Sequence, residues 1–472
     1  MNAPDPDAAA LEREPVLSVH GTMVRLCRLI GAPNLFENDG YRHYWFAQQL
    51  SSIPSNAIVY TMLILAVGQT GRSFYGSLFA ATYILPAVLV ATVSGALVDR
   101  LPKGAVMVAT SIVSAVLCVV LAISTDRLAV VYLVALAFAI TAQLAGAARS
   151  AAVPLIVGRE ELADANSLSN LGGLISQAVG LIVLPLVFLK TVGAAPLAFV
   201  CAALFAASLR EVLLIPHLGG RVGNLSAAVA GSNERFYEAW RELRRRRAVY
   251  LGMVLFVLTN AISLVVVTLV PRYATTVLNV DAQYGVYVVS PSVIGIWLGL
   301  RVVRSAFRAA REWWAISLSY AGLIAGVIAV GFVRTIADAL VGWGFLGPIG
   351  GHTTIETARI FVTMLLSVEL ASTYTFIAVA EKAMINERIP HEMQGSVFVA
   401  QNVLAGVASI PPILLTGLLA DVVGVTPVFI AVGTAAALIA VIAAATHQTI
   451  PDAGSSATPA PARPSRSALD RR

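Results

Sequence analysis

The sequence has few cysteines, few lysines and few charged residues of any kind. Only 12% of its 472 residues are charged, whereas soluble domains carry about 25%. Cys27, Cys118 and Cys201 have no metal-ligand spacing, and the last two lie within apolar runs, so neither a disulfide framework nor a metal site is expected. The sequence also lacks a phosphate-cradling Gly-x-x-x-x-Gly-Lys-Ser/Thr loop and a nucleophile elbow. We therefore expect no enzyme activity and no cofactor.

Apolar residues are what the chain has in excess. They make up 58% of it, which is more than one soluble core can bury, so lipid must solvate much of the surface. Twelve apolar runs are each long enough to cross the hydrocarbon core as a helix. They lie near residues 45–67, 76–98, 104–124, 129–152, 167–189, 192–213, 249–271, 284–304, 313–332, 358–380, 395–418 and 425–446. The sequence therefore predicts an all-α integral membrane protein with twelve transmembrane helices.

The basic residues indicate how the chain is oriented. If both termini are cytoplasmic, 26 of the 32 lysines and arginines fall in cytoplasmic segments and six fall outside. This asymmetry follows the positive-inside rule for an even number of spans, and it explains the net charge of +6 without a nucleic-acid partner. No signal peptide is visible. We expect a multi-pass protein of the inner (plasma) membrane with cytoplasmic N- and C-termini.

The longest cytoplasmic connector divides the chain into two halves. Its second part predicts an interfacial amphipathic helix, because Phe236, Trp240 and Leu243 fall on one helical face. Two six-span repeats with a substrate path between them are the organisation that this pattern indicates. The predicted divisions are a cytoplasmic N-terminal segment (1–44), a first half (45–213), the linker (214–248), a second half (249–446) and a disordered tail (447–472).

The connector between the second and third runs combines an acid, two bases, a glycine and a proline. Gly95 allows a close helix approach, and Asp99 can accept hydrogen bonds from a nearby helix N-terminus. Arg100 and Lys103 suit the cytoplasmic face. The spacing resembles the Gly-x-x-x-Asp-Arg-x-Gly-Arg/Lys loop between helices 2 and 3 of the major facilitator superfamily, with Pro102 where the family usually has Gly. The resemblance implies a conformational gate; a turn with ordinary anchoring charges is the alternative.

Other stretches resemble one branch of that superfamily, the enterobactin exporters and macrolide-efflux proteins. The segment from Arg388 to Asn402 also resembles bacterial lysophospholipid transporters. Together these resemblances cover about residues 42–446 and imply two pseudo-symmetric six-helix halves that rock around a central site. The stretches that resemble the exporter branch are Thr70–Ser73 with Gly76 and Pro86, Arg149–Pro154, Arg159–Asn166, Pro390–Gly395, and Gly417–Asp421 with Gly424.

The fifth run departs from the pattern of drug–proton antiporters. Those proteins carry Gly-x-x-x-Gly-Pro-x-x-Gly-Gly there, whereas this chain has Ser176 and Gln177 in place of Gly-Pro. We still expect Gly172, Gly173 and Gly180 to form a face that packs against another helix. The departure puts antiport in doubt and leaves lipid transport open.

One carboxylate, Glu369, lies at the centre of a predicted span. An ionisable group at that depth costs about 2.5–3.5 kcal/mol on insertion scales, and low dielectric favours its neutral form. Ser372 and Thr373 lie about one turn further on and share its face. We expect Glu369 to face the central cavity and to carry a proton or a cationic substrate group. An interhelical hydrogen-bonding acid with no transport role is the alternative.

The first predicted span holds a polar cluster. Gln48, Ser52 and Asn56 fall on one face at helical spacing, and polar groups within a span normally face the bundle interior. They line a substrate path, or they hold helices together. Asn260, at the corresponding position of the seventh span, is a further candidate.

Together these features predict a secondary transporter that works by alternating access. The expected activity is export of an amphipathic small molecule, such as a drug or siderophore, by proton-coupled antiport. Lysophospholipid transport is the alternative, and a transporter-shaped sensor without flux is a third class. The expected partners are a small-molecule substrate, the lipid bilayer and protons, and the expected assembly is a monomer.

Overall fold

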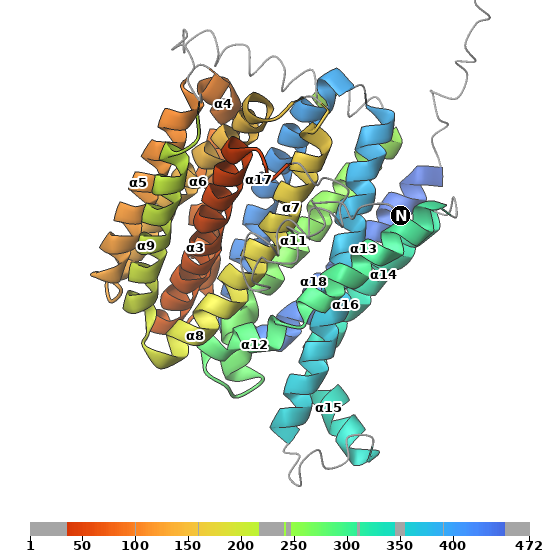
Figure 1. Cartoon of the computed structure of the whole chain (residues 1–472). Coiled ribbons are helices and arrows are strands. Elements are labelled where there is room, and N and C mark those ends of the chain that lie inside the picture. The colour runs from red at the N-terminus through yellow and green to blue at the C-terminus, as the bar shows by residue number, and fades with distance from the viewer. Residues whose placement is uncertain are drawn as a thin grey trace, which may run out of the picture.

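The computed structural model describes residues 35–99, 101–158, 160–216, 240–241, 247–308, 312–344, 355–389 and 391–448. Every regular element within these ranges is a helix (Figure 1). The predicted N-terminal segment before residue 35, most of the predicted linker helix and the predicted disordered tail lie outside the described residues.

The first half consists of six helical spans, one of which contains a π-helical turn. Next to this turn, Pro185 has no N–H to donate and its ring crowds the preceding turn, so the hydrogen-bond pattern changes locally. The fifth span therefore comprises α7 (Leu162–Ala178), the π-helical turn η1 (Val179–Val183) and α8 (Leu184–Thr191). The other five spans are α3 (Asp39–Thr70), α4 (Ser73–Asp99), α5 (Lys103–Ala122), α6 (Leu128–Ile156) and α9 (Ala194–Leu213).

The second half repeats this organisation with two interruptions. Pro291 lies in the turn that separates α12 (Gly285–Val289) from α13 (Ser292–Arg308). The short helix α15 (Val333–Gly342) is bent by 77° from the end of α14 (Glu312–Gly331) and packs beside the start of α16. The remaining elements are α11 (Arg247–Thr276), the 3-10 turn η2 (Ala282–Tyr284), α16 (Ile355–Arg388), α17 (His391–Val423) and α18 (Val425–Gln448).

The helices confirm the predicted all-α membrane fold. Ten described helices are long and apolar enough to cross a membrane, the bent α14–α15 pair makes an eleventh candidate, and α18 carries a shorter apolar stretch, Val425–Val441. Several helices extend beyond the predicted spans. α3, for example, begins at Asp39 because the Asn38 side chain accepts a hydrogen bond from the Tyr41 N–H at 3.2 Å and caps the helix.

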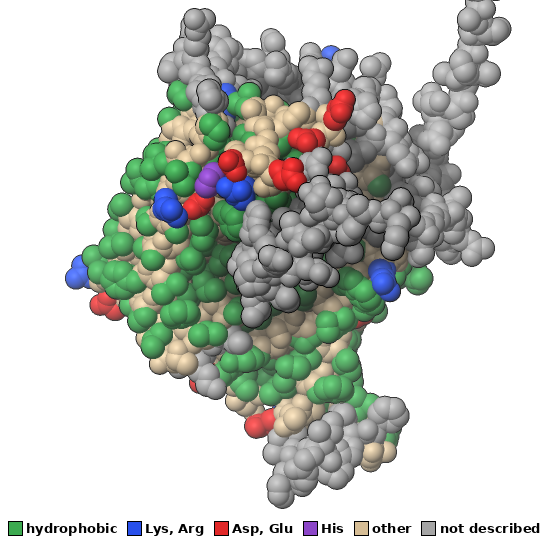
Figure 2. Space-filling model, in the orientation of Figure 1, with side chains coloured by type: hydrophobic (Ala, Val, Ile, Leu, Met, Phe, Trp, Pro, Cys, Tyr) green, Lys and Arg blue, Asp and Glu red, His purple; other side chains and the backbone are tan. Residues whose placement is uncertain are grey.

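Each half has its own apolar core, and the outer surface is apolar as well. The rings of Phe138 and Phe205 pack edge to face in the first core, and those of Tyr273 and Phe429 do so in the second. In Figure 2 most of the coloured side chains at mid-height of the visible face are hydrophobic, whereas most of its charged side chains lie toward one end. That end holds the start of α3. We call it the Asp39 end and the opposite one the Thr70 end, after the first and last residues of α3 (Figure 1).

Candidate substrate cavity and gate

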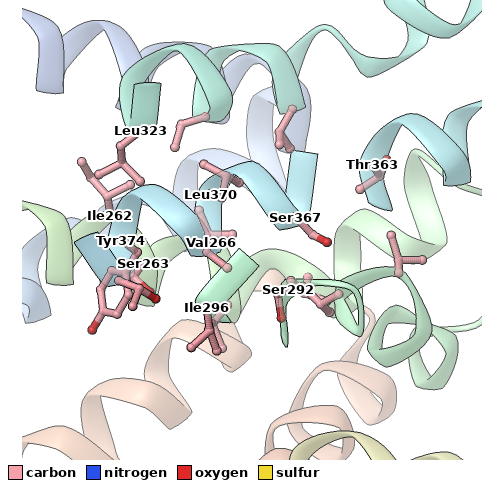
Figure 3. Close-up of a pocket in the computed structure, with 18 of the residues that line it drawn as sticks. Ile262, Ser263, Val266, Ser292, Ile296, Leu323, Thr363, Ser367, Leu370 and Tyr374 are labelled. Atoms are coloured by element: carbon pink, nitrogen blue, oxygen red, sulfur yellow. The ribbon is translucent and has the colours of Figure 1, made fainter. Parts of the chain in front are cut away.

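A cavity of about 670 Å³ lies mainly between α11, α13 and α16 of the second half (Figure 3). Most of its lining is apolar, with Ile262, Val266, Ile296 and Leu370 among the side chains around it. Gln177 of α7 is the one lining residue from the described part of the first half. The polar lining residues of the second half are Ser263, Tyr273, Ser292, Thr363, Ser367, Tyr374, Thr375 and Lys382.

Small residues on α13 set one wall of the cavity, because they let α13 approach the backbone of α16. A Cβ added at Gly299 would lie 2.9 Å from the Thr375 Cβ, and one added at Gly295 would overlap the Val368 carbonyl oxygen. Replacing either glycine would therefore push the two helices apart. This close packing brings the hydroxyl groups of Ser292 on α13 and Ser367 on α16 to the same cavity.

The structure places Glu369 on the side of α16 that faces α14. Gly322 and Gly326 of α14 make room for its carboxyl group: a Cβ at Gly322 would lie 3.2 Å from Glu369 Oε1, and one at Gly326 would overlap Oε2. Oε2 is buried and has no hydrogen-bond partner among the described residues. Glu369, Ser372 and Thr373 are not among the residues that line the cavity, although Leu370 and Tyr374 of the same helix are. The Thr373 hydroxyl donates to the Glu369 backbone carbonyl at 3.0 Å.

The structure reveals a second buried carboxyl group, Glu381, which the sequence pattern had not indicated as a site residue. Its residue is 2% exposed, and neither carboxyl oxygen has a hydrogen-bond partner among the described residues. The buried Gln401 of α17 lies near it. The predicted span ended at residue 380, but α16 continues to Arg388. The sequence carried a signal for this extension, because the apolar residues Met384 and Ile385 follow the predicted end of the span.

The predicted polar residues of α3 make hydrogen bonds within the protein. Gln48 Nε2 donates to the Ser169 carbonyl of α7 at 3.2 Å, and Asn56 Nδ2 donates to the Ser52 carbonyl of α3 at 2.8 Å. None of the three predicted α3 residues lines the 670 Å³ cavity. Asn260 on α11 lies 3.4 Å from the Ser409 hydroxyl of α17 and links those two helices.

Two of the three predicted α7 and η1 glycines lie against α3. A Cβ at Gly172 would overlap the Gln49 amide, which accepts a hydrogen bond from the Ser176 hydroxyl. A Cβ at Gly180 would overlap the Ile53 carbonyl of α3. Gly173 differs, because a Cβ there would meet nothing within 4 Å.

These neighbouring glycines give a matched pair of stability predictions. Gly172→Val should destabilise the protein by about 1–3 kcal/mol, because it displaces the buried Gln49 amide. Gly173→Ala should be neutral or stabilising by up to about 1 kcal/mol, because alanine favours a helix and the site is open. Thermal unfolding of the two purified variants in detergent checks both. Equal losses would contradict the packing described here.

The predicted gate motif lies where α4 meets α5 at the Asp39 end. Lys103 begins α5, and its Nζ donates to the Val98 carbonyl near the end of α4 at 2.8 Å. Gly95 and Asp99 belong to the last turns of α4, and Arg100 lies outside the described residues. Lys103 therefore helps to cap the C-terminus of α4, as a cation does at that end of a helix dipole.

A carboxylate joins the two halves at the opposite end of α4. Asp421, near the end of α17, accepts hydrogen bonds from the backbone N–H groups of Ser73 (2.6 Å) and Phe74 (3.0 Å), which begin α4. A carboxylate at a helix N-terminus satisfies free N–H groups and favours the helix dipole. We call this contact the Asp421 cap. The sequence resemblance had included Asp421 but had not indicated its partner.

Small residues on α17 bring it close to α4 over much of their length. A Cβ at Gly417 would lie 2.6 Å from the Ser77 Cβ, and one at Gly406 would overlap the Val88 side chain. Residue numbers fall along α17 as they rise along α4, so the two helices are antiparallel. They form the principal junction between the halves.

Two six-span helical halves, a cavity in the membrane-spanning region and a tight helix junction are the features expected of a multi-pass membrane transporter. The family model described as Major Facilitator Superfamily matches residues 44–378. The chain belongs to the major facilitator superfamily.

Solved structures with a similar fold include several transporters. The nucleoside transporter NupG has a TM-score of 0.66 at 12% identity, covering 87% of this chain and 100% of that chain. A POT family transporter in complex with 5-aminolevulinic acid has a TM-score of 0.64 at 13% identity, covering 86% and 95%. The POT family transporter PepTSo has a TM-score of 0.59 at 13% identity, covering 87% and 98%. No curated protein sequence matches the chain. At these identities the likeness shows the fold alone, so the exporter branch stays a prediction.

Proposed function

We propose that this transporter exports an amphipathic small molecule by alternating access, and that the 670 Å³ cavity binds it. The composition of the cavity wall carries the proposal. Its volume is in the range of sites for small organic ligands. Its apolar walls suit a hydrophobic body, and its hydroxyl groups can donate to or accept from a few polar atoms. A strongly polar substrate would leave most of its hydrogen bonds unmade in such a site.

We place the cytoplasm at the Asp39 end and propose that the gate at that end mirrors the Asp421 cap. The antiparallel register of α4 and α17, continued from Val88 and Gly406, leads from Asp99 to the first turns of α17. Asp99 would cap α17 in one state, as Asp421 caps α4 in the other. Alternating access would then exchange one carboxylate cap for the other across the same helix pair.

Proton coupling is the second part of the proposal, with Glu369 as the proton carrier. Its carboxyl group lies between α14 and α16, and α16 also lines the cavity. Low dielectric favours the neutral acid while the niche stays closed. Movement of α16 against α14 would admit water and allow the proton to leave, so that protonation would follow the conformational state.

Lipid transport is a second candidate, and the shape of the cavity favours it. The wall reaches beyond α11 and α16 to Leu323 and Val327 of α14 and Phe429 of α18, all of them apolar. The one basic residue in the described lining is Lys382, on the part of α16 nearer the Asp39 end. An acyl chain would fit the apolar part, and a phosphate group would be attracted to the lysine.

Transport into inside-out vesicles tests the proposal. We expect accumulation of amphipathic compounds that requires a proton gradient. Ser367→Trp, which fills the cavity, should reduce the rate about tenfold or more, because overpacking of about 1–3 kcal/mol opposes binding. Val441→Trp, at an exposed position on α18, is the control and should transport normally. Unaltered transport by Ser367→Trp would contradict the assignment of the cavity, and labelled lysolipid uptake that is insensitive to the gradient would favour lipid transport.

A further inference from the structure

The side chain of Arg149 is half-buried between the helices of the first half of the molecule. The positive-inside count placed this residue among the cytoplasmic bases. In the structure it belongs to α6, about two turns before the helix ends at Ile156. Its guanidinium donates to the Ser51 hydroxyl of α3 at 3.2 Å. That hydroxyl in turn donates to the Gln48 carbonyl at 3.0 Å. The arginine thus points away from the 670 Å³ cavity and into the four helices of its own half.

A cavity of about 20 Å³ lies beside Arg149, between α3, α5, α6 and α9. A space of this size holds one water molecule or one monatomic ion. Its polar lining residues are Ser51, Ser55, Thr110, Ser111, Ser114, Arg149 and Ser208.

The charge of Arg149 has no counter-charge among the described residues. Glu211, an acid at the same end of the bundle, contacts His43 at 2.7 Å and Arg210 at 3.4 Å instead. A guanidinium keeps its charge at all physiological pH values. A cation held inside a membrane bundle without a partner is costly, and a buried charge is normally paired.

The hydroxyl groups around this cavity differ in what they can still donate. Those of Ser55, Thr110 and Ser208 already donate to backbone carbonyls, at 2.7, 2.9 and 2.9 Å respectively. The buried Ser111 and Ser114 of α5 make no such recorded bond within the described part of the chain. The cavity therefore offers spare donors and one positive charge. An anion can use both, whereas a water molecule would leave the charge uncompensated.

We propose that this cavity binds a single halide ion, which under ordinary conditions is chloride. The Arg149 guanidinium and the hydroxyl groups of Ser111 and Ser114 would hold it. The ion would neutralise Arg149 and tie α5 to α6, so that the first half moves as one body. This proposal does not depend on the substrate or on proton coupling.

Thermal unfolding of the full-length protein in detergent tests the site. In chloride-free sodium gluconate at constant ionic strength, added chloride or bromide should raise the melting temperature by several degrees and saturate, because the ion binds only the folded state. Arg149→Met should lose this rise. Arg127→Met, at an exposed position at the opposite (Thr70) end of the bundle, should keep it. The double variant Ser111→Ala, Ser114→Ala should need at least a severalfold higher halide concentration for the same rise.

A second measurement needs no variant and therefore does not depend on how well Arg149→Met folds. Crystals of the wild-type protein grown in bromide should show an anomalous peak within hydrogen-bonding distance of Arg149. The proposal would be overturned if halide had no saturable effect on the melting temperature of the wild-type protein. That is the result expected if a carboxylate of the chain neutralised Arg149. A halide effect of equal size in Arg149→Met would overturn it as well.

Discussion

Gly417→Leu is expected to reduce transport to background while the protein still reaches the membrane. A Cβ at this position would lie 2.6 Å from the Ser77 Cβ and 3.2 Å from the Phe74 Cα. The Phe74 Cα belongs to the backbone of α4 and cannot move aside without moving the helix. The larger side chain would hold α17 away from α4 and keep the Thr70 end from closing. Vesicle transport together with immunoblotting of the membrane fraction measures both properties.

The control for this variant is Gly68→Leu. Gly68 is exposed near the same end of the bundle, and a Cβ there would meet nothing within 4 Å. It should transport at the wild-type rate. Wild-type transport by Gly417→Leu would mean that the α4–α17 junction does not close tightly during the cycle.

Asp421→Ala should have a smaller effect at the same junction. Loss of an N-cap costs about 0.5–2 kcal/mol, so the closed Thr70 end should become about 2- to 30-fold less populated. Asp421→Asn keeps an acceptor oxygen and should lie between wild type and Asp421→Ala. The measurement is the labelling rate of a cysteine placed at Ser292, in the cavity, with an impermeant maleimide added from the Thr70 side. No change in that rate would show that the cap does not hold the two halves together.

Glu369→Gln is expected to abolish substrate accumulation driven by a proton gradient and to preserve exchange of substrate across the membrane. The glutamine amide mimics the protonated acid in shape but cannot release a proton, so the cycle can bind and exchange substrate without net proton movement. Proteoliposomes provide both measurements, with an imposed gradient for accumulation and preloaded substrate for exchange.

Glu381→Gln is the matched comparison, because it removes the other buried and unpartnered carboxyl group of the same helix. If Glu369 carries the proton, Glu381→Gln should remain coupled. Coupling that survives in Glu369→Gln and fails in Glu381→Gln would move the proton site to Glu381. If both variants behave as wild type, Glu369 is an interhelical acid and neither of these two carboxyl groups carries the proton.

The positions of the membrane helices could be predicted because they depend on local chemistry. A run of about 20 apolar residues is enough to define a span, whatever it packs against. The π-helical turn that precedes Pro185 also follows from local chemistry, because the missing proline N–H changes the hydrogen bonds of the neighbouring turn. The helix ends were less predictable. α3 gains a turn and a half through the Asn38 cap and the buried Tyr41, which depend on neighbouring segments.

The direction in which a side chain points could not be predicted in the same way. A single span has no sequence signal that distinguishes the face toward a cavity from the face toward another helix. Glu369 was expected to face the cavity, but its carboxyl group lies against Gly322 and Gly326, 43 or more residues away in the chain. The Asp421 cap joins residues that are 348 positions apart. Arg149 was counted among the cytoplasmic bases although it lies near the end of its predicted run, because the sequence does not show that its side chain turns toward Ser51 of α3.

Distances between the two halves test the central claim most directly. Spin-label pairs at Arg127 and Asp281 report the Thr70 end, and pairs at Leu214 and Arg301 report the Asp39 end, because all four residues are exposed. Cys27→Ser is the background, since Cys118 and Cys201 are buried. Double electron–electron resonance in lipid nanodiscs should give two populations whose proportions change with substrate or pH, with one pair lengthening as the other shortens. A single unchanging distance for both pairs under all conditions would contradict alternating access.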